Sequence, residues 1–395
     1  MGLRLTELNL VVDNQIAHTS VLFETILLHS AIQPGTHTTL TTLKEHGNNT
    51  TTMTIPLYPD FVMENSLSPD AFGAEVDEIC EEIESATKGL GANRQRVIDA
   101  LATQNPTQRA KISMRYMEMY GSDHKRFKDM SDLMKKEFSG DFGTALEFLA
   151  LPPHQAECAM LRKACKGIGA DVNVIWSIVC GRTNEEMELL KKTFFQMYNK
   201  DLSKLLASET HGNMERLVFN CLQAAEETFD PAFHTLDKAR EDADLIHKYG
   251  QGRIGTNEKG IFKVICAAPP EHLSNISNMY AEKYGYTIAK AIEKELGGMG
   301  EKNLRRAALF EIGMKLKPHE TMSRLIDQAC RGFGTDELLL TTSLIRFQTH
   351  MANVNTAHID EFGKTIHERI REEVSGKYKA LLLQVVNTVW PETGM

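Results

Sequence analysis

The chain has 395 residues, a net charge of −9 and no uncharged apolar run long enough to span a bilayer. This composition excludes an integral membrane protein. It also disfavours nucleic acid or a bare acidic membrane as a direct partner, because electrostatic binding to phosphate requires a basic surface. The seven cysteines stand singly, without the paired spacing of a metal motif, and their odd number disfavours a disulfide framework. A soluble protein of a reducing intracellular compartment is the simplest interpretation.

Residues 1–70 differ in composition from the rest of the chain. Serine, threonine, histidine and asparagine are dense from His29 to Thr54, and Pro56, Pro59 and Pro69 interrupt any helix. We therefore expect residues 1–70 to form a poorly ordered N-terminal extension.

Helical periodicity begins at Ala71. Apolar residues recur at three- and four-residue steps before each of four glycine-containing phrases, as in Val76, Ile79 and Ile83. A second apolar segment follows each phrase: 97–101, 174–179, 261–265 and 338–344. The pattern predicts an all-α protein in which each phrase is a loop between two helices.

The four phrases form an internal repeat of about eighty residues. A glutamate follows 42 residues after Gly167 and Arg253, 41 after Gly332 and 48 after Gly89, and we place the extra residues of the first repeat between 123 and 135. A unit of this length is a small domain in itself. The phrases, each with its downstream glutamate, are residues 88–91 with Glu137, 166–169 with Glu209, 252–255 with Glu295 and 331–334 with Glu373.

A loop of this composition can bind a cation. Helix ends leave carbonyl groups without intrahelical partners, and glycine lets the backbone turn so that further carbonyls point the same way. Ca²⁺ accepts six to eight oxygen ligands, so several carbonyls, one carboxylate and water suffice. Thr256 and Thr335 are expected to cap the helices that follow. The alternative is that the glycines only terminate helices and the glutamates are solvated surface charges, but the constant spacing favours the cation site.

The residue between the glycines is apolar in every phrase: Leu90, Ile168, Ile254 and Phe333. On membrane-facing loops these side chains would enter the headgroup region and bury apolar area. The alternative is that they fold back onto the adjoining helices.

The segment from about Ala71 to Val386 resembles the annexins, whose loop pattern is Lys-Gly-x-Gly-Thr followed by an acidic residue about forty positions on. Residues 181–183 and 375–378 are also similar to that family. The resemblance implies four repeats of about five helices each, at 71–150, 151–233, 234–316 and 317–388, forming a curved disc. It also implies calcium sites on the convex face that bind acidic phospholipids.

The resemblance carries over one carboxylate and two loop residues per repeat as calcium ligands. Ala92 and Ala170 replace the pattern's threonine, and Arg253 replaces the first glycine of the third phrase, so we expect the second repeat to hold the best site. The insertion before Glu137 is expected to displace that glutamate. The ligands implied are Gly89, Gly91 and Glu137; Gly167, Gly169 and Glu209; Arg253, Gly255 and Glu295; and Gly332, Gly334 and Glu373.

These observations predict a calcium-dependent phospholipid-binding protein that attaches peripherally to the inner, cytoplasmic face of membranes. No catalytic constellation is present in the sequence: His154, His211 and His319 are isolated, and no nucleotide fingerprint follows a strand. We expect no enzyme activity and no nucleic-acid partner, with self-association on the membrane left open. The alternative function is a calcium-independent helical scaffold that binds cytoskeletal proteins.

Overall fold

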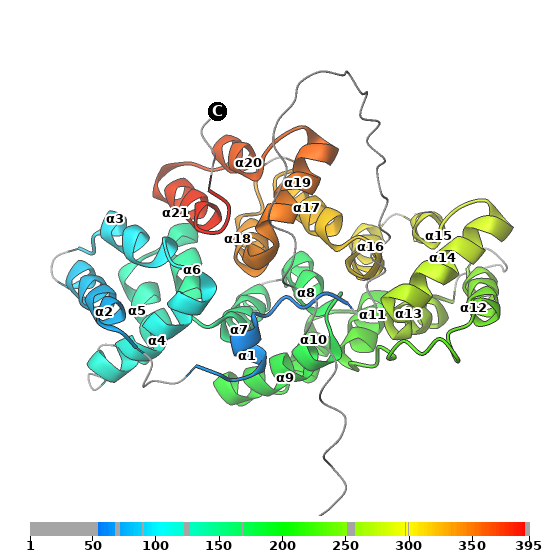
Figure 1. Cartoon of the computed structure of the whole chain (residues 1–395), viewed down its shortest axis with the longest axis horizontal. Coiled ribbons are helices and arrows are strands. Elements are labelled where there is room, and N and C mark those ends of the chain that lie inside the picture. Colours follow the sequence, from blue (N-terminus) through cyan, green and yellow to red (C-terminus); the bar gives the residue numbers. More distant parts are fainter. Residues whose placement is uncertain are drawn as a thin grey trace, which may run out of the picture. The chain divides into compact units, whose positions relative to one another are not determined.

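A computed structural model of the chain describes residues 54–67, 72–88, 91–121, 127–167, 169–250, 257–296, 298, 300–332 and 334–391. Within these residues the secondary structure is helical and contains no strand, which confirms the all-α prediction. Figure 1 shows the helices in chain order. In the same part of the chain, no helix combines the length and apolarity needed to cross a membrane.

After the short helix α1 (Asp60–Met63), the α-helices of the described residues fall into four successive groups of five. The first comprises α2 (Ala74–Thr87), α3 (Arg94–Val97) continued by the π-helical turn η2 (Ile98–Ala102), α4 (Pro106–Tyr120), α5 (Met130–Glu137) and α6 (Gly140–Leu149). The second comprises α7 (Pro153–Ala164), α8 (Val172–Val179), α9 (Asn184–Tyr198), α10 (Leu202–Glu209) and α11 (Gly212–Leu222).

The third group comprises α12 (Leu236–Tyr249), α13 (Glu258–Ala267), α14 (Pro270–Tyr284), α15 (Ile288–Glu295) and α16 (Lys302–Leu316). The fourth comprises α17 (Pro318–Ala329), α18 (Glu337–Arg346), the 3₁₀ turn η3 (Gln348–His350), α19 (Met351–Phe362), α20 (Ile366–Glu373) and α21 (Gly376–Asn387).

Two apolar cores hold the repeats together. One is continuous through repeats two, three and four, and the other fills repeat one. The last helix closes the fold, since Leu381 and Val385 of α21 belong to the core of the first repeat and α21 packs on η2 and α6 (Figure 1). Arg109 of α4 also donates a 2.5 Å hydrogen bond to the amide oxygen of Gln348.

Residues 54–67 are packed onto this helical core, contrary to the expectation of a poorly ordered extension for this part of the segment. Leu57 and Tyr58 are buried, and a short helix α1 (Asp60–Met63) follows them. The N–H groups of both residues donate to Glu186 Oε1, at 2.5 and 2.6 Å. Residues 1–53 lie outside the described residues.

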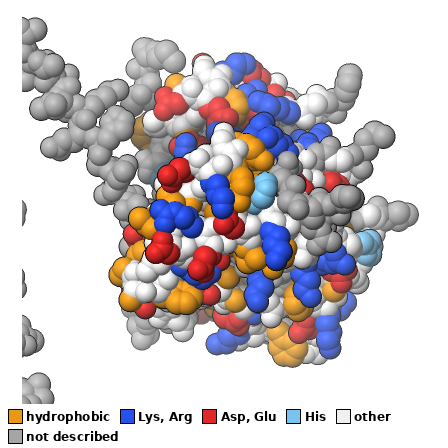
Figure 2. Space-filling view, turned by 90° about the vertical axis from the view of Figure 1, so that its right-hand side faces the viewer, with side chains coloured by type: hydrophobic (Ala, Val, Ile, Leu, Met, Phe, Trp, Pro, Cys, Tyr) orange, Lys and Arg blue, Asp and Glu red, His pale blue; other side chains and the backbone are white. Residues whose placement is uncertain are grey.

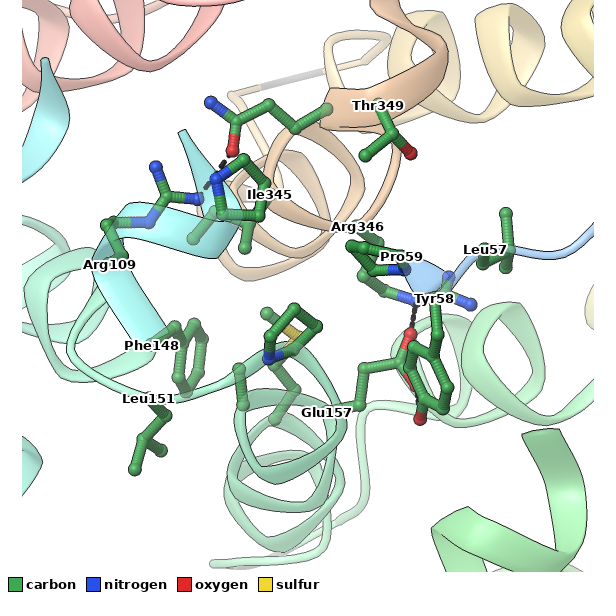
Figure 3. Close-up of a pocket in the computed structure, with 15 residues that line it drawn as sticks. Leu57, Tyr58, Pro59, Arg109, Phe148, Leu151, Glu157, Ile345, Arg346 and Thr349 are labelled. Carbon is green, nitrogen blue, oxygen red and sulfur yellow. Dashed lines mark hydrogen bonds and ion pairs between the residues drawn. The ribbon is translucent and has the colours of Figure 1, made fainter. Parts of the chain in front are cut away.

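The phenol of Tyr58 reaches a buried ion cluster that joins repeats two and four. Its hydroxyl donates to Glu157 Oε2 at 2.5 Å, and Arg346 Nε of α18 donates to the other carboxylate oxygen at 2.6 Å. Arg182, which follows α8, also pairs with Glu157. Figure 3 shows Tyr58 and Arg346 converging on Glu157. Burial alone would raise the pKa of Glu157, but the two arginines hold it below its usual value.

Candidate metal-binding loops

Each loop between the first and second helices of a repeat is closed by one backbone hydrogen bond. The N–H of the residue before the second helix donates to a carbonyl at the end of the first: Asn93 to Ala86 at 2.8 Å, Asp171 to Ala164 at 2.9 Å, Asn257 to Tyr249 at 2.7 Å and Asp336 to Ala329 at 2.8 Å. The bond spans seven residues in repeats one, two and four, and eight in repeat three. The third loop is therefore one residue longer than the others.

Glycine is required inside these loops by the backbone conformation. Gly167 and Gly332 have φ values of +117° and +123°, and Gly91, Gly169 and Gly334 have φ values of +91°, +88° and +93°. Other residues rarely adopt such positive angles, so the repeated glycines are conformational requirements. The described glycines of repeats two and four thus have nearly the same φ values at equivalent positions.

The loop carbonyls are available to a ligand. No donor among the described residues reaches the carbonyl oxygens of Gly167 or Gly169, nor those of Gly332 or Gly334. These glycines are exposed. Exposed, unpaired carbonyls held in one turn are a suitable ligand set for a hard cation such as Ca²⁺.

The four glutamates occupy one structural position. Glu137, Glu209, Glu295 and Glu373 are each the last residue of the fourth helix of their repeat. In repeats one, two and four a two-residue link follows, and the next helix begins at a glycine with φ between +60° and +66°. The repeat places a carboxylate at equivalent points in all four units.

In repeat four the carboxylate is linked directly to its loop. The Thr335 hydroxyl lies 3.3 Å from both the carbonyl oxygen and the Oε2 atom of Glu373. Arg369, one turn earlier in α20, lies 3.8 Å from the same carboxylate. Its guanidinium would compete with a bound cation for that negative charge. Burial, together with Glu373, raises the pKa of the Cys330 thiol to about 12.

In repeat two the carboxylate also lies near a cysteine at the start of its loop, but Ala170 replaces the threonine and no arginine stands one turn earlier. Cys165 occupies the position that Cys330 has in repeat four. Burial, reinforced by the negative charge of nearby Glu209, raises the pKa of the Cys165 thiol to about 12. Leu205 stands where repeat four has Arg369. A cation in the second loop would therefore meet no competing positive side chain at that position.

In repeat one the insertion does not disturb the glutamate's place on its helix. The link from α4 to α5 contains nine residues, whereas the link from α9 to α10 contains three, so the extra six lie before α5. The α5 and α10 helices have eight residues each, and both end on the glutamate. The insertion therefore leaves the register of Glu137 on its helix unchanged, and displacement of Glu137 from its loop stays a prediction. The Glu137 side chain is exposed, whereas that of Glu209 is half-buried.

Repeat three departs from the pattern at both loops. Besides the longer first loop, the link from α15 to α16 has six residues instead of two. The Glu295 side chain packs on the backbone at Gly250, where an added Cβ would lie 3.0 Å from its Cγ and Cδ atoms. The carboxylate still lies near the start of the loop.

The helix caps differ from the sequence-based assignment. Asp336, not Thr335, caps α18 through a 3.0 Å bond from the Leu339 N–H, and Asn93 and Asp171 cap α3 and α8 in the same way. Loops with Ala92 or Ala170 therefore keep their caps. The available signal was an asparagine or aspartate directly before the second apolar segment.

Several predicted residues lie outside the described residues. They are the ligands Gly89, Arg253 and Gly255, the threonine Thr256, and all four apolar residues between the glycines, Leu90, Ile168, Ile254 and Phe333.

Comparison with known proteins identifies the repeat. The annexin family profile matches residues 79–149, 156–220, 241–305 and 322–385. Annexin A5 of Cynops pyrrhogaster is 29% identical over 308 residues, which cover 78% of this chain and 91% of that protein. Human annexin A13 is 27% identical over 322 residues, covering 81% of this chain and 97% of that protein.

Solved structures show the same fold. A structure of a point mutant of annexin A8 with an intact N-terminus superposes with a TM-score of 0.71 at 26% identity, covering 81% of this chain and 97% of that one. Calcium-bound annexin (Sm)1 gives a TM-score of 0.64 at 22% identity, covering 80% of this chain and 91% of that one.

Proposed function

Because the chain belongs to the annexin family, we propose that it is a calcium-dependent phospholipid-binding protein. In this proposal Ca²⁺ bridges the interhelical loops to lipid phosphates, and the protein attaches peripherally to the inner, cytoplasmic face of acidic membranes. The observation that carries the proposal is the pairing, in repeats two and four, of unpaired glycine carbonyls with a glutamate near the same loop.

The charge distribution favours a bridging cation over direct attraction. The net charge is −9, and Figure 2 shows basic and acidic side chains intermingled over the described part of one face. Direct binding to anionic lipid requires a concentration of positive charge. A bound Ca²⁺ would supply that charge at the loops themselves.

Each proposed site offers a single carboxylate, so Ca²⁺ alone is expected to bind weakly, with a dissociation constant on the order of 10⁻⁴ to 10⁻³ M. Lipid phosphate would then replace water among the ligands. Several weak sites on one protein raise the effective concentration of lipid at one another and give a steep calcium dependence. Calorimetric titration without lipid checks the intrinsic affinity, and micromolar binding there would contradict the model of lipid-completed sites.

The decisive experiment is co-sedimentation with phosphatidylserine-containing vesicles across a calcium titration and in excess chelator. We expect binding in calcium and full release by chelator. Glu209→Gln should raise the calcium midpoint more than Glu137→Gln, because Glu137 is exposed, and neither should abolish binding. Circular dichroism confirms that both variants fold.

The alternative, a calcium-independent scaffold for cytoskeletal proteins, predicts the opposite result. Equal sedimentation in calcium and chelator, or no effect of either substitution, would favour it. The proposed role is binding, and it requires no catalytic step.

A further inference from the structure

A second cluster of metal-ligating side chains lies between repeats two and three, away from the glycine loops. Cys180 directly follows α8, Cys221 lies in α11, Cys266 in α13 and Glu311 in α16. Helices α11 and α16 pack against each other, and each also packs against α8 and α13 (Figure 1). Two of the ligand-bearing helices belong to each repeat.

The distances among Cys180, Cys221 and Glu311 are close to those of a tetrahedral zinc site, and Cys266 lies beside Cys221. The Cys221 Sγ atom lies 3.5 Å from Cys180 Sγ, 3.8 Å from Cys266 Sγ and 3.6 Å from Glu311 Oε2. Zinc bonds of about 2.3 Å to sulfur and about 2.0–2.2 Å to oxygen give tetrahedral edges of roughly 3.8 Å between sulfurs and roughly 3.5 Å between sulfur and oxygen. The ligand atoms of Cys180, Cys221 and Glu311 all lie within 4.8 Å of one another.

The surroundings of the cluster supply hydrogen bonds and a positive charge that a zinc site requires. The Gly181 N–H donates to Glu311 Oε2 at 2.6 Å and fixes the orientation of the carboxylate. The buried Lys315 ammonium lies 3.4 Å from Glu311 Oε1 and donates to the Cys266 carbonyl oxygen at 3.0 Å. Zn²⁺ bound by the thiolates and the carboxylate leaves excess negative charge, which the charge of Lys315 offsets in part.

The cluster is accessible to an ion from one side. Cys180 is buried, whereas Cys221 and Cys266 are partly exposed. A small hollow lined by Cys221, Cys266 and Glu311 opens beside them. Thiolate ligands select zinc over Ca²⁺, which prefers oxygen, so this chemistry differs from that of the glycine loops.

We propose that Cys180, Cys221 and Glu311 bind one Zn²⁺ and that the ion joins repeats two and three. Cys266, whose Sγ atom lies 3.8 Å from that of Cys221, becomes the fourth ligand when its side chain turns toward the ion. The ligands come from four helices of two repeats, so binding stabilises the junction. The site does not depend on the proposed membrane function.

The test uses the full chain, reduced and freed of metal by chelator and dialysis. We expect one Zn²⁺ per chain and, with Co²⁺ as a spectroscopic substitute, the absorption of thiolate-to-cobalt charge transfer. Cys221→Ser should weaken zinc binding more than tenfold. Cys80→Ser, which removes a buried cysteine of repeat one outside the cluster, should bind like the wild type. Excess Ca²⁺ should not displace the ion.

Thermal unfolding gives a second measurement, because a ligand that binds only the folded state raises the melting temperature. Zinc should raise it for the wild type and Cys80→Ser but not for Cys221→Ser. A cobalt spectrum without thiolate absorption, or unchanged zinc affinity in Cys221→Ser, would overturn the proposal. So would a reduced wild-type protein that binds no zinc but forms a Cys221 disulfide on oxidation. If Cys221→Ser does not fold, the wild-type cobalt spectrum decides alone.

Discussion

Replacing Gly167 by alanine tests whether the loop conformation in repeat two is needed for calcium-dependent membrane binding. Gly167 has a φ of +117°, and a Cβ added there would meet no atom within 4 Å. The effect of Gly167→Ala is therefore confined to the backbone. Holding a non-glycine residue in such a conformation costs about 1–3 kcal/mol.

In the metal-free Gly167→Ala variant the strained loop can relax, so the cost appears mainly when calcium restores the native loop conformation. A cost of 1–3 kcal/mol corresponds to about 5- to 150-fold weaker binding at this one site. Because other sites remain, we expect the calcium midpoint of vesicle co-sedimentation to rise by at least about twofold with the plateau unchanged.

Gly73→Ala is the matched control. Gly73 also has open space around its Cβ position, but its φ is −84°, which alanine adopts without strain. The control should leave the midpoint unchanged. If Gly167→Ala behaves like Gly73→Ala, the positive φ is not required for binding and the proposed role of the loop is wrong.

Three further substitutions test the described packing. Tyr58→Phe removes the hydroxyl that donates to Glu157 and should lower the free energy of unfolding in urea by about 1.5–3 kcal/mol. Tyr120→Phe is the control and should leave that free energy unchanged, because the Tyr120 hydroxyl has no hydrogen bond to the described residues. Lys315→Met leaves three carbonyl acceptors and two carboxylates without their buried partner and should cost about 3–5 kcal/mol in the same assay. His358 is buried, which lowers its pKa to about 4 from an ordinary value near 6.5. Its neutral form therefore favours folding above about pH 6.5, and stability should fall by at most about 3 kcal/mol as the pH drops from 6.5 to 4. His358→Gln should flatten that part of the pH profile.

The repeat architecture could be predicted from the sequence because its signals are local. Glycines and glutamates recur along the chain, and the structure gives the glutamates the same place in all four repeats and the described glycines equivalent φ values in repeats two and four. The position of the six-residue insertion could also be recognised in the sequence, but its effect on the helix that carries Glu137 could not. Only the helix bounds show that α5 keeps its length and that Glu137 stays at its end.

The features that the sequence missed depend on contacts between distant residues. Pro56 and Pro59 correctly indicated a break in helical structure, yet Leu57 and Tyr58 are ordered by Glu186 and Glu157, more than ninety residues away. Sequence periodicity contains no signal for such contacts.

The cysteine cluster shows the same limit. Cys180, Cys221 and Cys266 are separated by more than forty residues each, so no metal motif is visible in the sequence. Their sulfur atoms come together only because helices of two repeats pack side by side.

The backbone hydrogen bond that closes each glycine loop has a consequence for the proposed calcium binding. In repeat two, the bond from Asp171 to Ala164 ties the two ends of the loop to the helices before any ion arrives. Little chain entropy remains to be lost when an ion binds, so the free energy of binding is set mainly by removal of the ion's hydration water. If the loop binds Ca²⁺ as proposed, its occupancy should follow a brief calcium rise without waiting for the protein to fold or unfold.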